Sequence, residues 1–148
     1  MAHVKEGQAS QSALGHLLKE LRNDRRLTLR EVGQLAEVDH AYVHRLETGI
    51  KESPSEEVLA KLAKALKAHK REAEMLRYLA LHPEADSGLV DYVRTDPSIT
   101  FEIYAAAASA AFRGPRPDYA RHVERIRRIL EEDGDGRANG GAEGAGVR

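Results

Sequence analysis

Two histidines, an alanine and an arginine lie close together between residues 40 and 45, where the sequence reads HAYVHR. At helical spacing these four residues fall on the side away from the apolar residue Val43. Arginine matches the paired acceptors on the major-groove edge of guanine, and histidine can contact bases or phosphates. The spacing therefore predicts a base-contacting surface made of His40, Ala41, His44 and Arg45.

The same two histidines, His40 and His44, lie four residues apart, a spacing that can chelate a metal ion. The sequence has no Glu between them in an H-E-x-x-H arrangement and no third ligand at an obvious spacing. It also has no cysteine, no glycine-rich phosphate loop after a strand and no nucleophile–base arrangement. We therefore expect no metal, no cofactor and no enzymatic activity.

Residues 28–49 must position this surface, and they read as two short helices joined by a tight turn. Thr28 and Glu31 have the spacing of a capping box, and Asp39 can cap the second helix. Gly49 lies where a helix C-terminus favours a residue with positive φ. Two crossed helices with a polar outer face have the shape that enters a DNA major groove.

Residues 12–67 resemble the lambda-repressor-like (Xre) helix-turn-helix proteins of bacteria and phages. The family pattern is roughly T-Q-x-x-L-A-x-x-x-G-V-S-x-x-x-I-S-x-x-E-x-G, and this sequence keeps Thr28, Val32, Val38, Val43, Glu47 and Gly49. Leu29 replaces a phosphate-contacting Gln, Gly33 replaces a small Ala at the helix crossing, and Glu37 replaces the turn Gly. The last departure is expected to place a non-glycine residue in the left-handed conformation, at a cost of about 1 kcal/mol or more.

Two further sets of residues are expected to act here, and the resemblance implies the first of them. An Arg late in the first helix pairs with the Glu that closes the recognition helix, which here are Arg22 and Glu47. Contacts to DNA phosphates, which position the protein without specifying a sequence, are expected from Thr28, Arg30, Thr48 and Lys51. Arg30 is included only because its location would let it replace the missing Gln.

The apolar stripes predict an all-α chain: a five-helix lambda-repressor-like DNA-binding bundle with a C-terminal helical extension. The bundle occupies residues 10–82, with helices at about 10–26, 28–36, 39–48, 55–67 and 69–81. Ser53 with Glu56 or Ser55 alone can cap the fourth helix, and the sequence does not decide between them. Residues 1–9 are expected to be disordered.

The extension covers residues 86–132, with helices expected at 89–95, 98–112 and 117–132, the second started by Pro97. Its small residues and heptad-like spacing predict a dimer or partner interface. The residues of that interface are Phe101, Tyr104, Ala108, Phe112, Tyr119, Val123, Ile126 and Leu130. In the alternative, these helices fold back on the fifth helix of the same chain. Residues 133–148, rich in glycine and alanine, are expected to form a disordered tail.

Composition limits the partners. The chain has 148 residues and a formal net charge of −1, so any DNA contact must come from a local basic patch. The arginines at 121, 125 and 128 form one stripe, which we interpret as a solvated face. No apolar run approaches the ~20 residues of a membrane span, and we expect a cytoplasmic protein with no membrane partner.

These observations predict a sequence-specific DNA-binding transcriptional regulator, a homodimeric repressor that binds a palindromic operator in double-stranded DNA through the major groove. One alternative is an antitoxin, which would bind its toxin or another protein effector through the C-terminal helices and regulate its own synthesis through the same helix-turn-helix. A second alternative is a structural adaptor that keeps the bundle and binds no DNA.

Overall fold

The computed structural model describes residues 11–49, 53–112 and 118–147. Within them, helices joined by turns and loops are the only regular secondary structure, with no strand. The predicted disorder of residues 1–9 and the predicted phosphate contact of Lys51 lie outside the described residues. The helices are α2 (Ala13–Asp24), α3 (Leu29–Ala36), α4 (His40–Glu47), α5 (Glu56–Ala65), α6 (Lys70–Leu81), α7 (Ser87–Thr95), α8 (Phe101–Ser109) and α9 (Tyr119–Val147).

Local capping chemistry sets the ends of α3 and α4. The Thr28 hydroxyl accepts a hydrogen bond from the Glu31 amide at 3.1 Å, and the Glu31 carboxylate accepts one from the Thr28 amide at 2.8 Å. The Asp39 carboxylate accepts from the Ala41 amide at 2.9 Å. Glu37 ends α3 with φ 59°, and Gly49 follows α4 with φ 85°. The predicted capping box, cap and left-handed turn residue are therefore confirmed.

The structure also decides how α5 and α8 begin. The Ser55 hydroxyl accepts from the Val58 amide at 3.2 Å, so Ser55 caps α5. The predicted start of α8 at residue 98 is wrong, because Thr100 is its cap and the helix runs only from Phe101 to Ser109. The residues before it form a turn, in which the Asp96 carboxylate accepts from the amide of Ser98 at 2.9 Å and from its hydroxyl at 2.7 Å.

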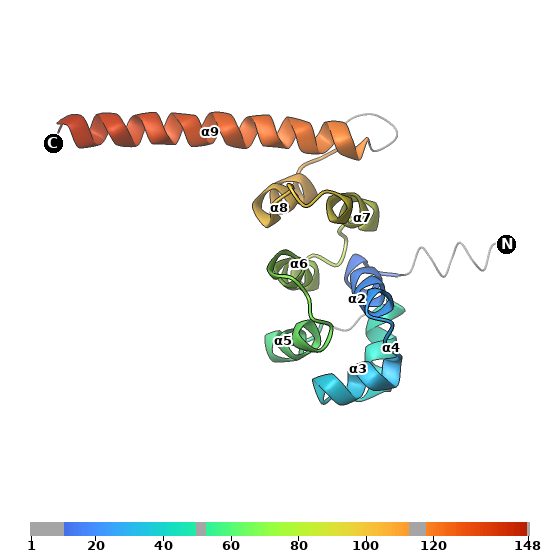
Figure 1. Cartoon of the computed structure of the whole chain (residues 1–148). Helices are drawn as coiled ribbons and strands as arrows, with labels where there is room; N and C mark the ends of the chain where they lie inside the picture. Colours follow the sequence, from blue (N-terminus) through green and yellow to red (C-terminus); the bar gives the residue numbers. More distant parts are fainter. Residues whose placement is uncertain (1–10, 50–52, 113–117, 148) are drawn as a thin grey trace.

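One hydrophobic core extends through both the predicted bundle and the predicted extension. Helix α2 packs against α4, α6 and α7, and its Leu17 and Leu18 are fully buried. Helix α6 packs against α5 on one side and α8 on the other. Helix α9 covers α8 at the end of the molecule opposite α3 and α4 (Figure 1). The C-terminal helices therefore complete the core that supports α2.

This packing corrects part of the predicted dimer or partner interface. Tyr104, Val123 and Ile126 are 0%, 2% and 6% exposed within a single chain, so they are not a free surface. Periodicity identified the buried faces of α8 and α9, but these faces pack within the chain, on α6 and on each other. The other members of the set are partly buried against the same core: Phe101, Ala108, Phe112, Tyr119 and Leu130.

Helix α9 also continues to Val147, through the segment for which we expected a disordered tail. The segment contains no proline to end the helix, although its glycines each disfavour a helix by about 1 kcal/mol.

Among the described residues, no helix is both long enough and apolar enough to span a membrane.

Candidate nucleic-acid interface

The outer side of α4 presents polar side chains to solvent. His40, Ala41 and His44 are exposed, whereas Arg45 is half-buried. The guanidinium carbon of Arg45 lies 5.6 Å from the centroid of the Tyr42 ring, within the range of a cation–π contact. All four residues predicted to contact bases therefore share one short helix, with the arginine side chain oriented by an aromatic neighbour.

An ion pair holds α4 on its scaffold. Arg22 Nε donates to Glu47 Oε2 at 2.7 Å, and Arg22 Nη2 donates to Glu47 Oε1 at 2.9 Å. Arg22 Nη1 also donates to the Leu27 carbonyl at 3.0 Å. The hydrogen bonds to Glu47 raise the pKa of Arg22 above its ordinary value. Because the Glu47 side chain is only 4% exposed, this paired geometry satisfies a carboxylate that would be costly to bury alone.

Two glycines let the scaffold approach α4 closely. A Cβ on Gly15 would lie 2.8 Å from the Glu47 carbonyl oxygen, so α2 can contact the end of α4 only without a side chain there. A Cβ on Gly33 would lie 2.8 Å from the Val38 carbonyl oxygen and 3.1 Å from the His40 amide nitrogen. Gly33 thus allows the turn to cross α3 at the start of α4.

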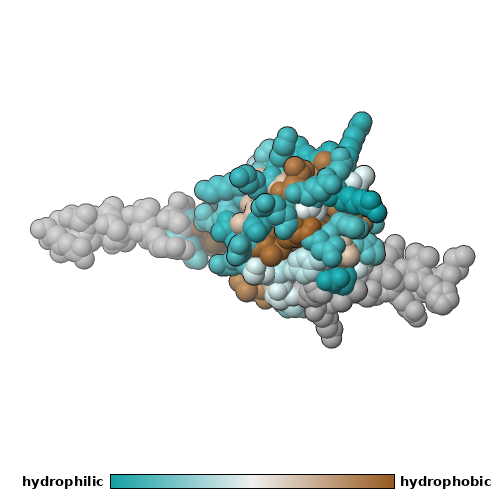
Figure 2. All heavy atoms as spheres, turned by 90° about the horizontal axis from the view of Figure 1, so that it is seen from below, coloured by the Kyte–Doolittle hydropathy of each residue, from teal (hydrophilic) through white to brown (hydrophobic). Residues whose placement is uncertain are grey.

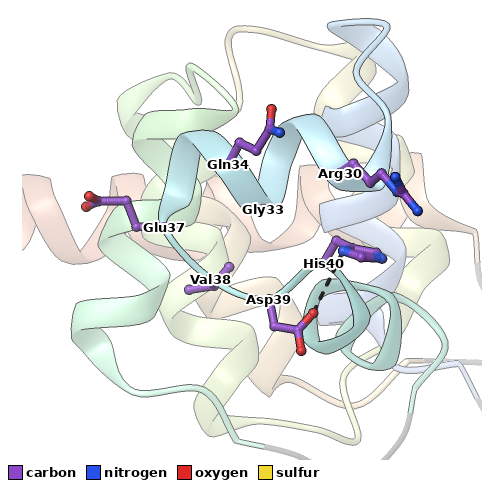
Figure 3. Close-up of a pocket in the computed structure, with 7 residues that line it drawn as sticks. All are labelled: Arg30, Gly33, Gln34, Glu37, Val38, Asp39 and His40. Atoms are coloured by element: carbon purple, nitrogen blue, oxygen red, sulfur yellow. Dashed lines mark ion pairs between the residues drawn. The ribbon is translucent and has the colours of Figure 1, made fainter.

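A pocket of about 420 Å³ lies between α3 and the start of α4 (Figure 3). Its lining residues are Arg30, Gly33, Gln34, Glu37, Val38, Asp39 and His40. Arg30 from α3 and His40 from α4 extend toward the same side in Figure 3, and His40 Nδ1 lies 3.8 Å from Asp39 Oδ1. The same pocket is therefore lined by Arg30, which is predicted to contact phosphates, and by His40, which is predicted to contact bases.

The hydroxyl groups of the two predicted threonine contacts already have partners in the chain. The Thr28 hydroxyl accepts from the Glu31 amide as part of the capping box, and the Thr48 hydroxyl donates to the His44 carbonyl at 3.0 Å. Thr28 and Thr48 therefore stabilise the ends of α3 and α4 directly, and their contact with phosphates stays a prediction.

Sequence reasoning missed Gln34, which is exposed and lines the pocket. It lies four residues after Arg30, so both are on the outer side of α3, and that spacing was a signal that could have identified it. An amide side chain can both donate and accept, which suits contacts with phosphates or base edges.

Figure 2 views the molecule from the end at which α3 and α4 lie. Hydrophilic side chains dominate this face and surround a smaller apolar patch. Leu35 on α3 is 59% exposed, an unusual position for a large apolar residue. A mainly polar face of this kind suits a charged, hydrated ligand, because protein–DNA interfaces are polar and wet.

Comparison with protein families identifies the domain that carries this site. Residues 13–76 match the family model described as a helix-turn-helix domain. Among solved structures, the clp gene regulator ClgR from C. glutamicum is 34% identical to the chain, and the match covers 51% of this chain and 94% of that one, with a TM-score of 0.40. No curated protein matches the sequence. The family match runs from the start of α2 to the middle of α6 and includes both helices of the site.

Proposed function

Residues 13–76 carry a helix-turn-helix domain, and from this we propose that the protein is a sequence-specific transcriptional regulator of the lambda-repressor-like (Xre) type. Helix α4 enters the major groove, which is wide enough to admit an α-helix. Its side chains at 40, 41, 44 and 45 contact base edges, and Arg30 with Gln34 on α3 contacts the flanking phosphates.

The ion pair beneath α4 supports this proposal, because it holds the recognition helix against its scaffold. Base readout requires the side chains of a recognition helix to be held to within a fraction of an ångström. Arg22 and Glu47 fix the end of α4, and Asp39 caps its start through the Ala41 amide. The helix is therefore held at both ends while its outer side stays exposed.

We further propose that the protein acts as a homodimeric repressor on a palindromic operator. One α4 spans only a few base pairs, and two-fold dimers of helix-turn-helix proteins place two recognition helices about 34 Å apart on DNA. Ile129 on α9 is 47% exposed, and Leu130 beside it is only partly buried, so α9 offers apolar surface for a second protomer. A dimer bound at an operator represses by excluding other proteins from the DNA that it covers.

Selection of bound sequences from a random DNA pool with the full chain, at a fixed salt concentration, tests the proposal. We expect enrichment of one motif with two-fold symmetry and half-sites about one helical turn apart. Enrichment of a single short half-site would contradict the dimer while supporting the regulator. Absence of any enriched motif would contradict sequence-specific binding and favour the structural adaptor.

A further inference from the structure

A cluster of metal-ligating side chains joins α2 to α7, at a place unrelated to the outer side of α4. His16 and Glu20 lie on α2 and Asp91 lies on α7, and one ligand atom of each lies within 4.8 Å of the other two. The closest pair is His16 Nε2 and Asp91 Oδ1, at 2.7 Å. From this cluster we propose that the protein binds one divalent transition-metal ion of the Zn²⁺ type through His16, Glu20 and Asp91.

The backbone provides the spacing that such a site needs. His16 and Glu20 are four residues apart, so they lie one turn apart on the same face of α2. That face packs against α7, which supplies Asp91 from the other side. An ion held at about 2.0–2.2 Å from each ligand requires its ligands to be separated by about 3.0–3.5 Å. His16 and Asp91, now 2.7 Å apart in direct contact, need to separate by only a few tenths of an ångström to admit the ion. The Glu20 ligand atom lies within 4.8 Å of both and reaches the ion by small rotations of its flexible stem.

The charges at this place favour a cation. The two carboxylates of Glu20 and Asp91 supply the charge that a divalent ion neutralises. The nearest arginine along α7, Arg94, is engaged with Asp24 at 2.6 Å and lies 3.9 Å from Glu72. The Glu20 side chain forms no hydrogen bond or ion pair with any residue that the structure describes. The third ligand is therefore available for coordination.

The donor set selects the class of metal. One imidazole nitrogen and two carboxylate oxygens suit Zn²⁺ and its neighbours in the transition series, whereas Mg²⁺ prefers oxygen ligands alone. Three protein ligands leave a fourth position of a tetrahedral ion for water. His16 is half-buried and Asp91 is exposed, so the ion can reach the site from solvent. Bound metal would clamp α7 onto α2, the helix that also carries Arg22.

Titration calorimetry of the full chain, made without a polyhistidine tag, tests the site with Zn²⁺ alone. We expect one Zn²⁺ per chain and at least tenfold weaker binding in Glu20→Gln and in Asp91→Asn. Glu20→Gln is the decisive variant, because no described contact depends on Glu20. Zn²⁺ should also raise the melting temperature of the natural chain, but not that of Glu20→Gln.

A matched control removes the other histidine pair with a four-residue spacing, His40 and His44, by substituting both with Gln. We expect this double variant to bind Zn²⁺ as tightly as the natural chain. The proposal is overturned if no stoichiometric Zn²⁺ binds, if binding survives in Glu20→Gln and Asp91→Asn, or if the control loses it. Equal binding of Mg²⁺ would overturn the assigned class of metal.

Discussion

Arg22 and Glu47 face each other across the α2–α4 contact with two parallel hydrogen bonds, although 25 positions separate them in the chain. The arginine also donates to the Leu27 carbonyl, which lies in the connection that leads into α3. One guanidinium therefore joins three parts of the helix-turn-helix domain: α2, the loop that follows it and the last turn of α4.

Removing either partner of this pair should destabilise the chain strongly. Arg22→Ala leaves a carboxylate that is 4% exposed without its countercharge, a situation that costs about 3–5 kcal/mol when burial is complete. We expect Arg22→Ala and Glu47→Ala each to lower the free energy of unfolding by roughly that amount, and the double variant to lose much less than the sum. Denaturant unfolding measures all three.

The exposed pair Arg128 and Glu124 on α9 is the matched control for this cycle. Their side chains are 72% and 56% exposed, and exposed ion pairs contribute about 0–1 kcal/mol. If the losses of stability for Arg22→Ala and Glu47→Ala simply add, and the coupling energy is as small as that of the control pair, then the contact between Arg22 and Glu47 does not stabilise the fold.

Arg45→Ala should weaken binding to the selected operator and relax preference at one base pair. A good bidentate contact to guanine is worth about 1–3 kcal/mol of discrimination, whereas a phosphate contact discriminates little. The matched variant is Arg30→Ala, which should weaken binding to specific and random DNA alike. Competition binding at fixed salt compares the two. If Arg45→Ala loses the same affinity on all DNA sequences, then Arg45 contacts a DNA phosphate instead of a base.

Ser55→Ala should destabilise the chain by about 1 kcal/mol, the usual cost of losing a helix cap. The reason is that the Ser55 hydroxyl accepts from the Val58 amide at the start of α5. Ser53→Ala, two residues earlier and also exposed, should change stability by less than about 0.5 kcal/mol. Thermal unfolding of the two variants distinguishes them. A larger loss of stability in Ser53→Ala would show that Ser53, and not Ser55, caps α5.

Gly33→Ala should destabilise the helix-turn-helix even though alanine is the commoner residue at this place in the family that the sequence resembles. A Cβ there would lie 2.8 Å from the Val38 carbonyl oxygen, so the turn must move. Overpacking of this kind typically costs about 1–3 kcal/mol. Unfolding by denaturant measures the loss, and we also expect weaker operator binding because α4 begins at the displaced turn. Unchanged stability would mean that the turn adapts freely.

Ile129→Glu should convert the proposed dimer to a monomer and weaken binding to a palindromic operator. The side chain is 47% exposed on α9, so the charge disturbs association more than folding. Leu81→Glu is the control, because Leu81 is 78% exposed on α6. Light scattering at micromolar concentration gives the mass of each. The proposed role of α9 in the dimer would be contradicted if the natural chain is already monomeric. It would also be contradicted if Leu81→Glu dissociates the dimer and Ile129→Glu does not.

The helix-turn-helix was predictable from sequence because its signals are local. Thr28 with Glu31, Asp39, and Gly49 each act within a few residues, and each has its expected conformation. The start of α8 was not predictable, because Asp96 and Thr100 are both competent caps. Only packing decides that Asp96 serves a turn and Thr100 the helix.

Contacts between distant segments were beyond what periodicity can show. The apolar stripe that contains Tyr104 predicts a buried helix face. It does not show whether a second chain or the same chain covers that face. The pairing of His16 with Asp91 joins residues 75 positions apart, so the four-residue spacing of His16 and Glu20 gave no hint of a third ligand. The proposed metal site accordingly departs from the sequence expectation that no metal binds.

The position of α2 determines how the chain can open. This helix packs against α4, α6 and α7, and its Leu17 side chain is fully buried in the core. A backbone amide at the centre of α2 can exchange its hydrogen with solvent only when several helices separate together. The recognition helix and the C-terminal helices therefore share their slowest opening event, and local fraying is confined to the outer turns of the described helices.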